Sequence, residues 1–167
     1  MIVIRETIVE DIDNIYNHLN LNYVRKYCKN SEEEQKQNHK QWYSFLINSP
    51  FYTMFTVESF EGEFLGIVKF EIEEDFEGAE ISLYLAENIR GKGYSTTIIN
   101  ASTEEIKFKY PDLKYVVAYI LEENIRSILC FQKADFLFKG QIEHRDIEYQ
   151  LYMKMLDWWR YWNDKKR

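Results

Sequence analysis

A short glycine-containing run, Arg90-Gly91-Lys92-Gly93-Tyr94-Ser95, most constrains how this chain can fold. It separates an alternating segment, 79–85, that predicts a β-strand from a segment, 96–108, that predicts a helix. Two glycines let backbone N–H groups turn toward one point, and the positive N-terminal end of the helix faces the same point. The run therefore predicts an anion cradle between a strand and a helix, although a glycine-rich loop gains its meaning only from its surroundings.

Length and composition indicate one domain. The chain has 167 residues and shows no repeat, low-complexity stretch or linker, so we expect a single domain over residues 1–167. The first residues meet an acidic side chain at Glu6 before any long apolar segment. We therefore expect neither a secretory signal nor a transmembrane helix, and a cytoplasmic location. The two cysteines and three histidines are scattered, so the sequence proposes no metal site.

The net charge of −7 limits the classes of partner. General nucleic-acid binding needs a basic face, and an anionic membrane surface would be repelled, so we expect neither partner. An acidic protein suits a cationic small substrate. A polyanionic cofactor would then need a local basic patch, which Arg90, Lys92 and Lys133 can supply, although each lysine is equally well read as a surface charge.

The order of the predicted elements indicates a mixed α/β fold. In chain order we expect a strand at 1–6, helices that start at capping-box sequences at 7–10 and 31–34, strands at 52–60, 63–72 and 79–85, the helix after the glycine run, a strand at 115–121, a helix at 123–134, and strands at 136–143 and 147–155. This order predicts an α+β sheet of about seven mostly antiparallel strands with helices on both faces. It does not predict a Rossmann repeat.

This element order and the glycine run together resemble the GNAT superfamily of acyl-CoA-dependent N-acyltransferases. The signature of that superfamily is Gln/Arg-x-x-Gly-x-Gly/Ala at the start of a helix. Arg90 holds the first position, Gly93 the fourth, and Ser95 replaces the last small residue. The resemblance implies that the backbone amides of this run, including those of Gly91, Lys92 and Tyr94, bind the pyrophosphate of coenzyme A.

A second segment, 124–136, resembles the family pattern Asn-x-x-Ala/Ser-x-x-Leu-Tyr-x-Lys-x-Gly-Phe. The spacing is kept by Asn124, Ser127, Lys133 and Phe136, whereas Cys130, Phe131 and Asp135 replace the Leu, the Tyr and the Gly. The resemblance implies that the Asn and Ser side of this helix lies along the pantetheine arm.

The strand before the glycine run is where the resemblance places the chemistry. In the family two middle strands splay apart to receive pantetheine, which implies that backbone groups of Leu83, Tyr84 and Leu85 bind the arm. Glu80 lies where several members carry a general-base glutamate. Glu80 is equally well read as a solvated strand charge, and Tyr84 either orients the substrate or is a core tyrosine.

Phe131 departs from the family pattern, because many members carry a tyrosine there that protonates the departing thiolate. Three interpretations follow: solvent or another tyrosine (Tyr84, Tyr94 or Tyr119) replaces it, the enzyme is slow, or the site binds acyl-CoA without turnover. We favour the first, because general-acid help is worth only ~10²–10⁴-fold.

The acceptor is the least constrained part of the prediction. His39, Trp42 and Tyr43 fall on a common face of the helix that overhangs the acceptor pocket in this family, and the region after Ser31 resembles members that acetylate nucleotide-linked amino sugars. An aromatic helix face is, however, more often core. Three tryptophans in the aromatic-rich extension 156–167 cover the domain's own helices, form a homodimer contact or shape the acceptor site.

We therefore expect an acetyl-CoA-dependent N-acetyltransferase that transfers directly to a primary amine of a small metabolite. A nucleotide-linked amino sugar is the first expected acceptor, and a polyamine or other cationic amine is the second. The alternative from a different class is a non-catalytic acyl-CoA-binding protein.

Overall fold

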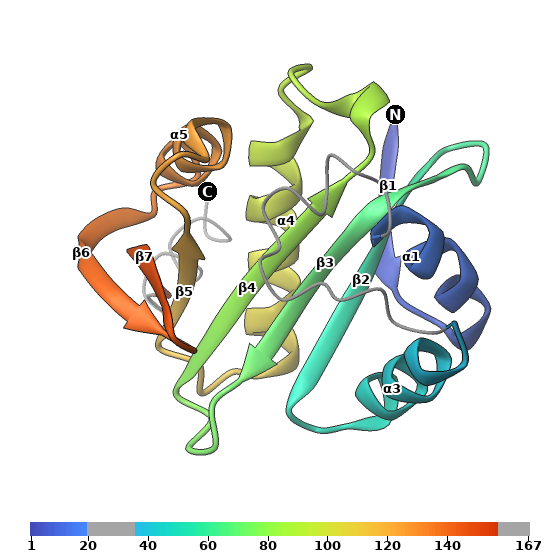
Figure 1. Ribbon diagram of the computed structural model, residues 1–167, viewed down its shortest axis with the longest axis horizontal. Helices are drawn as coiled ribbons and strands as arrows, with labels where there is room; N and C mark the ends of the chain where they lie inside the picture. Colours follow the sequence, from blue (N-terminus) through green and yellow to red (C-terminus); the bar gives the residue numbers. More distant parts are fainter. Residues whose placement is uncertain (20–35, 157–167) are drawn as a thin grey trace, which may run out of the picture.

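The computed structural model describes residues 1–19 and 36–156 (Figure 1). The capping box predicted at 31–34 and the tryptophan-rich ending at 157–167 lie outside these described residues, so the interpretations of that ending stay predictions. Within the described ranges, no helix is both long enough and apolar enough to cross a membrane.

The elements follow the predicted order, with ends that differ by a few residues. They are β1 (Ile2–Glu6), η1 (Val9–Asp11), α1 (Ile12–Leu19), α3 (Lys36–Asn48), β2 (Tyr52–Ser59), β3 (Phe64–Ile72), β4 (Gly78–Leu85), η2 (Glu87–Ile89), α4 (Tyr94–Lys109), β5 (Tyr115–Ile120), α5 (Ile125–Lys133), β6 (Leu137–His144) and β7 (Ile147–Met155). The predicted mixed α/β fold with a seven-stranded sheet is confirmed.

The sheet consists of two antiparallel halves joined by one short parallel seam. Its strand order is β1-β2-β3-β4-β5-β7-β6, and only β4 and β5 pair in parallel. Their pairing is confined to Gly78–Glu80 against Tyr115–Val117. Figure 1 shows the two strands diverging toward their C-terminal ends. A parallel pair needs a long crossover connection, which here contains the glycine run and α4.

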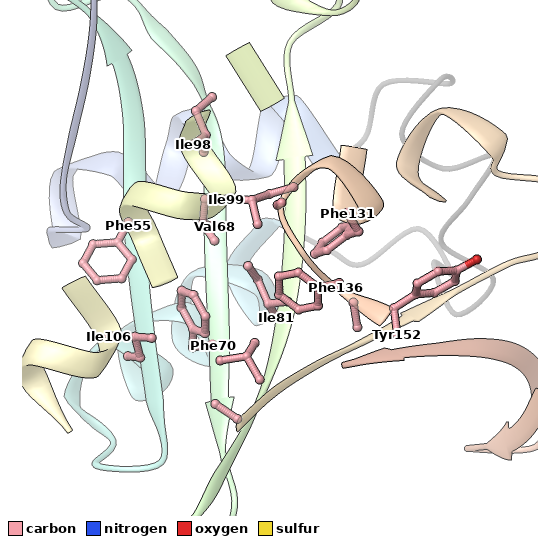
Figure 2. Packing of buried hydrophobic residues seen from close by; sticks show 14 of the residues in the cluster. Phe55, Val68, Phe70, Ile81, Ile98, Ile99, Ile106, Phe131, Phe136 and Tyr152 are labelled. Carbon is pink, nitrogen blue, oxygen red and sulfur yellow. The ribbon is translucent and has the colours of Figure 1, made fainter. Parts of the chain in front are cut away.

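One face of the sheet carries the larger hydrophobic core. The isoleucines of α4 pack against strand residues such as Phe70 and Ile81, and Figure 2 shows Ile98, Ile99 and Ile106 facing these strands. Helix α5 contributes to the same cluster. This face therefore excludes water along most of β3 and β4.

The opposite face carries a smaller core under α1 and α3. Ile15 and Leu46 are buried there against Met54 and Ile67. The alternation of side chains along each strand explains the division, because successive residues point to opposite faces of the sheet.

The start of the first helical segment differs from the predicted capping box at 7–10. The Thr7 hydroxyl does not cap the helix but lies 3.0 Å from the Thr56 hydroxyl. The Asp11 carboxylate instead accepts a hydrogen bond from the Ile8 backbone N–H at 2.9 Å, and a 3₁₀ turn precedes α1. Arg5 donates two further bonds to Asp11, at 2.8 and 2.9 Å. The predicted cap is wrong because the helical segment starts one residue later: Ile8 is the N-cap and Asp11 accepts from its N–H, whereas the Thr7 N–H donates to the Met54 carbonyl.

Candidate active site

The opening between β4 and β5 begins where their pairing ends, at Glu80 and Val117. Beyond this point the edge of β4 that faces β5 runs through Leu83, Tyr84 and Leu85, the residues predicted to bind the pantetheine arm. On the other side, β3 continues to pair with β4 as far as Leu85. The geometry thus supplies the splay that the family resemblance implied, and the contacts with pantetheine stay a prediction.

Gly66 of β3 keeps this part of β4 in place. Its φ is +150°, and a Cβ at this position would lie 2.1 Å from the Tyr84 carbonyl oxygen. No side chain therefore fits between the two strands at this point without moving β4. The close approach fixes the backbone of Tyr84 at the edge of the opening.

The glycine run is a turn that leads into α4. Gly91 and Gly93 have φ of +73° and +83°, a left-handed conformation that strongly favours glycine. A Cβ at either position would meet nothing within 4 Å, so the backbone, not packing, demands glycine here. Gly93 is the N-cap of α4 and makes no side-chain capping bond. The first N–H groups of α4 are thus available to an anion.

The side chains of the run divide between a structural contact and solvent. Arg90 Nε donates a hydrogen bond to the Leu85 carbonyl at 2.9 Å, which ties the run to the end of β4. Lys92 and Tyr94 are exposed, and Ser95 is half-buried. Helix α4 begins at Tyr94, two residues earlier than the sequence predicted.

Asn124 and Ser127, predicted to lie along the pantetheine arm, form the N-terminal cap of α5. The Asn124 side chain accepts a hydrogen bond from the Ser127 backbone N–H at 3.3 Å. Lys133 is exposed in the last turn of the helix. The cap gives Asn124 a structural role, and the predicted contacts of all three residues with coenzyme A stay predictions.

Phe131 has a clear structural role at the other end of α5. Phe136 N–H donates to the Phe131 carbonyl at 3.0 Å and Asp135 N–H to the Gln132 carbonyl at 3.1 Å, which is the Schellman arrangement of a helix end. The two phenyl rings meet edge to face with centroids 5.0 Å apart, as Figure 2 shows. Phe131 is only 3% exposed. The ring in place of the family's tyrosine thus belongs to the larger core.

An acidic cavity of about 250 Å³ lies at the start of β4, on the face of the sheet opposite α4. It contains four carboxylates and one guanidinium, and we call it the acidic cavity. Its lining residues are Glu71, Ile72, Glu73, Glu74, Glu80, Val117, Tyr119, His144 and Arg145.

Glu80 is the most perturbed carboxyl of the acidic cavity. Burial raises its pKa above the ordinary value, and the nearby Arg145 and His144 partly counteract that effect. One carboxylate oxygen, Oε2, lies 3.4 Å from His144 Nε2 and 3.9 Å from an Arg145 nitrogen. Arg145 makes its hydrogen bonds to Glu71, at 3.0 and 3.1 Å. A carboxyl with a raised pKa next to the opening is suited to proton transfer.

Tyr84 and Glu80 point to the same face of β4, because they are separated by an even number of residues. Tyr84 packs against the smaller core. That contact agrees with the interpretation of Tyr84 as a core tyrosine. A role in orienting the substrate stays a prediction.

Helix α3 divides the three residues predicted to bind the acceptor. His39 and Tyr43 are buried and stack with ring centroids 4.3 Å apart. Trp42 is 48% exposed and stacks on the exposed Phe45. The prediction of a common face is therefore wrong for Trp42, which points to solvent because it lies outside the stripe that meets the sheet. Contact of any of the three with substrate stays a prediction.

Sequence reasoning did not select His144, Arg145 or Glu71. His144 ends β6, and Arg145 and Asp146 form the turn to β7 with φ of 51° and 62°. The sequence predicted this hairpin but carried no signal for the strand against which its turn lies. Tyr119, named only as one of three alternative proton donors, also lines the cavity.

Comparison with known families decides the assignment. The model of the acetyltransferase (GNAT) domain matches residues 2–137. The chain belongs to the GNAT acetyltransferase family. This membership confirms the prediction of an acyl-CoA-dependent N-acetyltransferase. No curated protein matches the chain.

Solved structures with the same fold include two kinds of acetyltransferase. A spermidine N-acetyltransferase from Vibrio cholerae, in complex with CoA and spermine, is 20% identical, with a TM-score of 0.81 over 92% of this chain and 95% of that chain. The aminoglycoside acetyltransferase AAC(6')-Ib in complex with coenzyme A is 17% identical, with a TM-score of 0.82 over 100% of both chains. At these identities the likeness shows the fold.

Proposed function

We propose that this GNAT enzyme transfers the acetyl group of acetyl-CoA directly to a primary amine of a small polycationic metabolite. The observation that carries the proposal is the acidic cavity around Glu80, at the point where the β4–β5 seam ends. A polyamine or an aminoglycoside-like amine has the charge that this cavity favours.

Charge is the main argument for a cationic acceptor. Within the cavity, Arg145 is bound to Glu71, which leaves Glu73, Glu74 and Glu80 as the carboxylates that it does not hydrogen-bond. Carboxylates at a cavity attract the several ammonium groups of a polyamine and repel the diphosphate of a nucleotide-linked sugar. Neighbours with the same fold support this choice, since one is in complex with spermine and another with kanamycin.

The nucleotide-linked amino sugar therefore becomes the second candidate. Its basis was a short resemblance that starts at Ser31, and the part up to residue 35 lies outside the described residues. Trp42, which belongs to the same resemblance, faces solvent. Arg145 is the cavity's guanidinium and the feature that favours an anionic group on the acceptor.

In the proposed reaction Glu80 is the general base. Amines of this class have pKa values near that of lysine, about 10.4, so fewer than about one molecule in a thousand is neutral at pH 7. A base must remove a proton before the nitrogen attacks the thioester carbon. The raised pKa of Glu80, caused by burial, brings it closer to the range in which a carboxylate accepts a proton well at neutral pH.

Tyr119 is the proposed proton donor to the thiolate. Of the three tyrosines considered, it lines the acidic cavity on β5, one alternate position beyond Val117. Burial and the neighbouring Glu80 raise the pKa of its hydroxyl, so the group keeps its proton at neutral pH. Tyr94 is exposed in the first turn of α4 and Tyr84 packs against the smaller core.

The decisive experiment measures release of coenzyme A from acetyl-CoA with a panel of amines. The panel contains spermidine, kanamycin, a nucleotide-linked amino sugar and a peptide with a free N-terminus. We expect spermidine or kanamycin to react and the anionic sugar not to react. Reaction of the sugar alone would reverse the choice of acceptor. Binding of acetyl-CoA without release for any amine would support a non-catalytic acyl-CoA-binding protein instead.

A further inference from the structure

His144 lies beside Glu80, although 64 positions of chain separate the two residues. The distance from His144 Nε2 to Glu80 Oε2 is 3.4 Å. Nε2 is buried and makes no hydrogen bond with the described part of the chain, and the Glu80 carboxylate lies within ion-pair distance of it. The side chains come from the end of β6 and the start of β4, and only the folded sheet brings them together.

The imidazole ring of His144 is held in one plane by aromatic neighbours. Tyr119 stacks on it with ring centroids 3.9 Å apart and an interplanar angle of 5°. Tyr149 meets it edge to face at 6.3 Å. A ring fixed in this way keeps Nε2 in one place, 3.4 Å from Glu80 Oε2.

We propose that His144 is a positioning residue for Glu80: its Nε2, 3.4 Å from Oε2, holds that oxygen and so turns the other carboxylate oxygen toward the incoming amine. The inference rests on the proposed function of Glu80 as general base. It assigns a role to a histidine that lies outside both family motifs. A carboxylate that is held by one oxygen keeps a fixed direction for the lone pair that receives the proton.

The groups that face Glu80 come from every strand around it. Glu71 and Lys69 belong to β3, Tyr119 belongs to β5, and Arg145 follows β6. Tyr52 of β2 lies near Glu71 and also experiences the charge of Glu80.

These neighbours act on Glu80 in opposite directions. Burial raises the pKa of Glu80, and Glu71 adds to that effect. Arg145, His144 and Lys69 lower it. Arg145 is hydrogen-bonded to Glu71, and its nitrogen lies 3.9 Å from Glu80 Oε2, whereas His144 Nε2 lies 3.4 Å from the same oxygen. His144 is therefore better placed than Arg145 to hold the Glu80 carboxylate.

The proton transfers balance in the proposed reaction. The ammonium form of the acceptor loses one proton to Glu80, and the neutral nitrogen then attacks the thioester carbon. A C–N bond forms, the C–S bond breaks, Tyr119 gives its proton to the thiolate, and the second proton of the nitrogen restores the Tyr119 hydroxyl. The products are the acetamide and coenzyme A, and Glu80 later returns its proton to water.

The first test compares the pH profiles of three forms of the enzyme with spermidine as acceptor: wild type, His144→Gln and Tyr149→Phe. Without His144 the pKa of Glu80 is higher, because a group that lowered it is gone. We expect His144→Gln to move the acidic limb of kcat/KM to higher pH, with a loss of about ten-fold on that limb. Tyr149→Phe keeps the ring and leaves the limb in place. A lower rate with an unmoved limb would mean that His144 is merely structural and would overturn the proposal.

The second test does not depend on turnover. The ¹³C signal of the Glu80 carboxyl group is followed through a pH titration in the same three proteins. We expect a higher midpoint in His144→Gln than in wild type and Tyr149→Phe. Equal midpoints overturn the inference. Should no amine react, the proposed function fails and this titration still decides whether His144 acts on Glu80.

A third variant tests the role of the stacked ring. Tyr119→Leu removes the flat surface that holds His144, while Tyr119→Phe keeps it. We expect the Glu80 midpoint to rise in Tyr119→Leu by less than in His144→Gln, and to stay close to that of wild type in Tyr119→Phe. A Tyr119→Phe midpoint as high as that of Tyr119→Leu would show that the hydroxyl, not the stack, matters, and would contradict the positioning by the ring.

Discussion

The two faces of β4 differ in their surroundings, although the strand is only eight residues long. On one face, Ala79, Ile81 and Leu85 are buried in the larger core under α4 and α5. On the other, Glu80 lines the acidic cavity and Tyr84 packs beside the smaller core. Adjacent residues of one strand thus divide between a packed core and a cavity lined by carboxylates.

The difference shows how one strand can carry a partly buried carboxyl, whose desolvation lowers the stability of the fold. A buried carboxyl is destabilising when it is ionised, because burial removes the water that solvates its charge. The apolar face of the same strand offsets that cost through the packing of its alternate side chains. Mutations at neighbouring positions should therefore have opposite consequences for activity and stability.

Glu80→Gln is expected to have the largest effect on activity. Removal of the general base should lower kcat by about 10²–10⁴-fold, measured as release of coenzyme A at saturating acetyl-CoA. Binding of acetyl-CoA, measured by calorimetry, should stay unchanged. A rate close to that of wild type across the pH range would show that Glu80 is not the general base. The face of β4 that carries Glu80 would then have no role in proton transfer.

The same variant should be more stable than wild type at neutral pH. The folded state raises the pKa of Glu80, so its contribution favours folding at low pH and is lost as pH rises through that raised pKa. Gln carries no charge to desolvate. The Tm difference between Glu80→Gln and wild type should therefore be positive at pH 7 and should shrink at pH 4. A lower Tm for Glu80→Gln than for wild type at pH 7 would contradict the destabilisation assigned to the desolvation of Glu80.

Ile81→Ala is expected to have the largest effect on stability. Ile81 is 3% exposed in the larger core, and truncation of such a side chain costs about 2–5 kcal/mol of the free energy of unfolding. The folded fraction should keep its kcat, because the side chain points away from the acidic cavity. Urea unfolding monitored by tryptophan fluorescence measures the loss. A fall in kcat comparable with that of Glu80→Gln would remove the distinction between the faces.

Arg145→Gln is expected to have a smaller effect than Glu80→Gln and Ile81→Ala, and to act on the binding of the acceptor. Arg145 offsets part of the negative charge of Glu71 and Glu80. Its removal should lower KM for spermidine by about three- to ten-fold at low salt, while KM for acetyl-CoA stays constant. Steady-state kinetics near pH 8, where a higher pH favours the ionised form of Glu80, measures both KM values. A higher KM for spermidine, or a weakened reaction with the nucleotide-linked sugar, would favour the anionic acceptor.

Asp135→Gly is expected to have the smallest effect. Asp135 occupies the left-handed position after α5 with φ of 66°, where the family carries glycine. Relief of the left-handed strain outweighs the entropy that glycine loses on folding, for a gain of about 0.5 kcal/mol in the free energy of unfolding. Activity should not change, because Asp135 is exposed after the end of α5 and does not line the acidic cavity. Destabilisation, measured by the same urea unfolding, would show that the Asp side chain itself stabilises the end of the helix.

The order of the elements could be predicted from the sequence, because hydrophobic period and turn residues are local signals. The strand before the glycine run and the helix after it follow from residues 79–108 alone. The errors lie at element ends, as with the capping box predicted at 7–10, where the N-cap is Ile8 and the Thr7 hydroxyl contacts Thr56 instead. Which residue begins a helix depends on tertiary partners, here Arg5 and Thr56, which bind Asp11.

The candidate site was predictable only in part. Glu80 and the glycine run could be selected because a family pattern marks their positions. His144 and Arg145 could not be, because a hairpin turn carries no information about the strand that it meets in space. Trp42 was misassigned because helical spacing alone does not fix how wide the buried stripe of α3 is.

The short seam between β4 and β5 has a consequence for hydrogen exchange. Only three residue pairs join the antiparallel half β1–β4 to the half β5–β7 through the sheet. Amide protons at the seam should therefore exchange with deuterium sooner than those in the middle of either half, since local opening there breaks the fewest ladder bonds. A pantetheine arm between the strands would act as an added strand across the gap. In the proposed complex the cosubstrate would complete the sheet, and its departure would loosen the same backbone that carries Glu80.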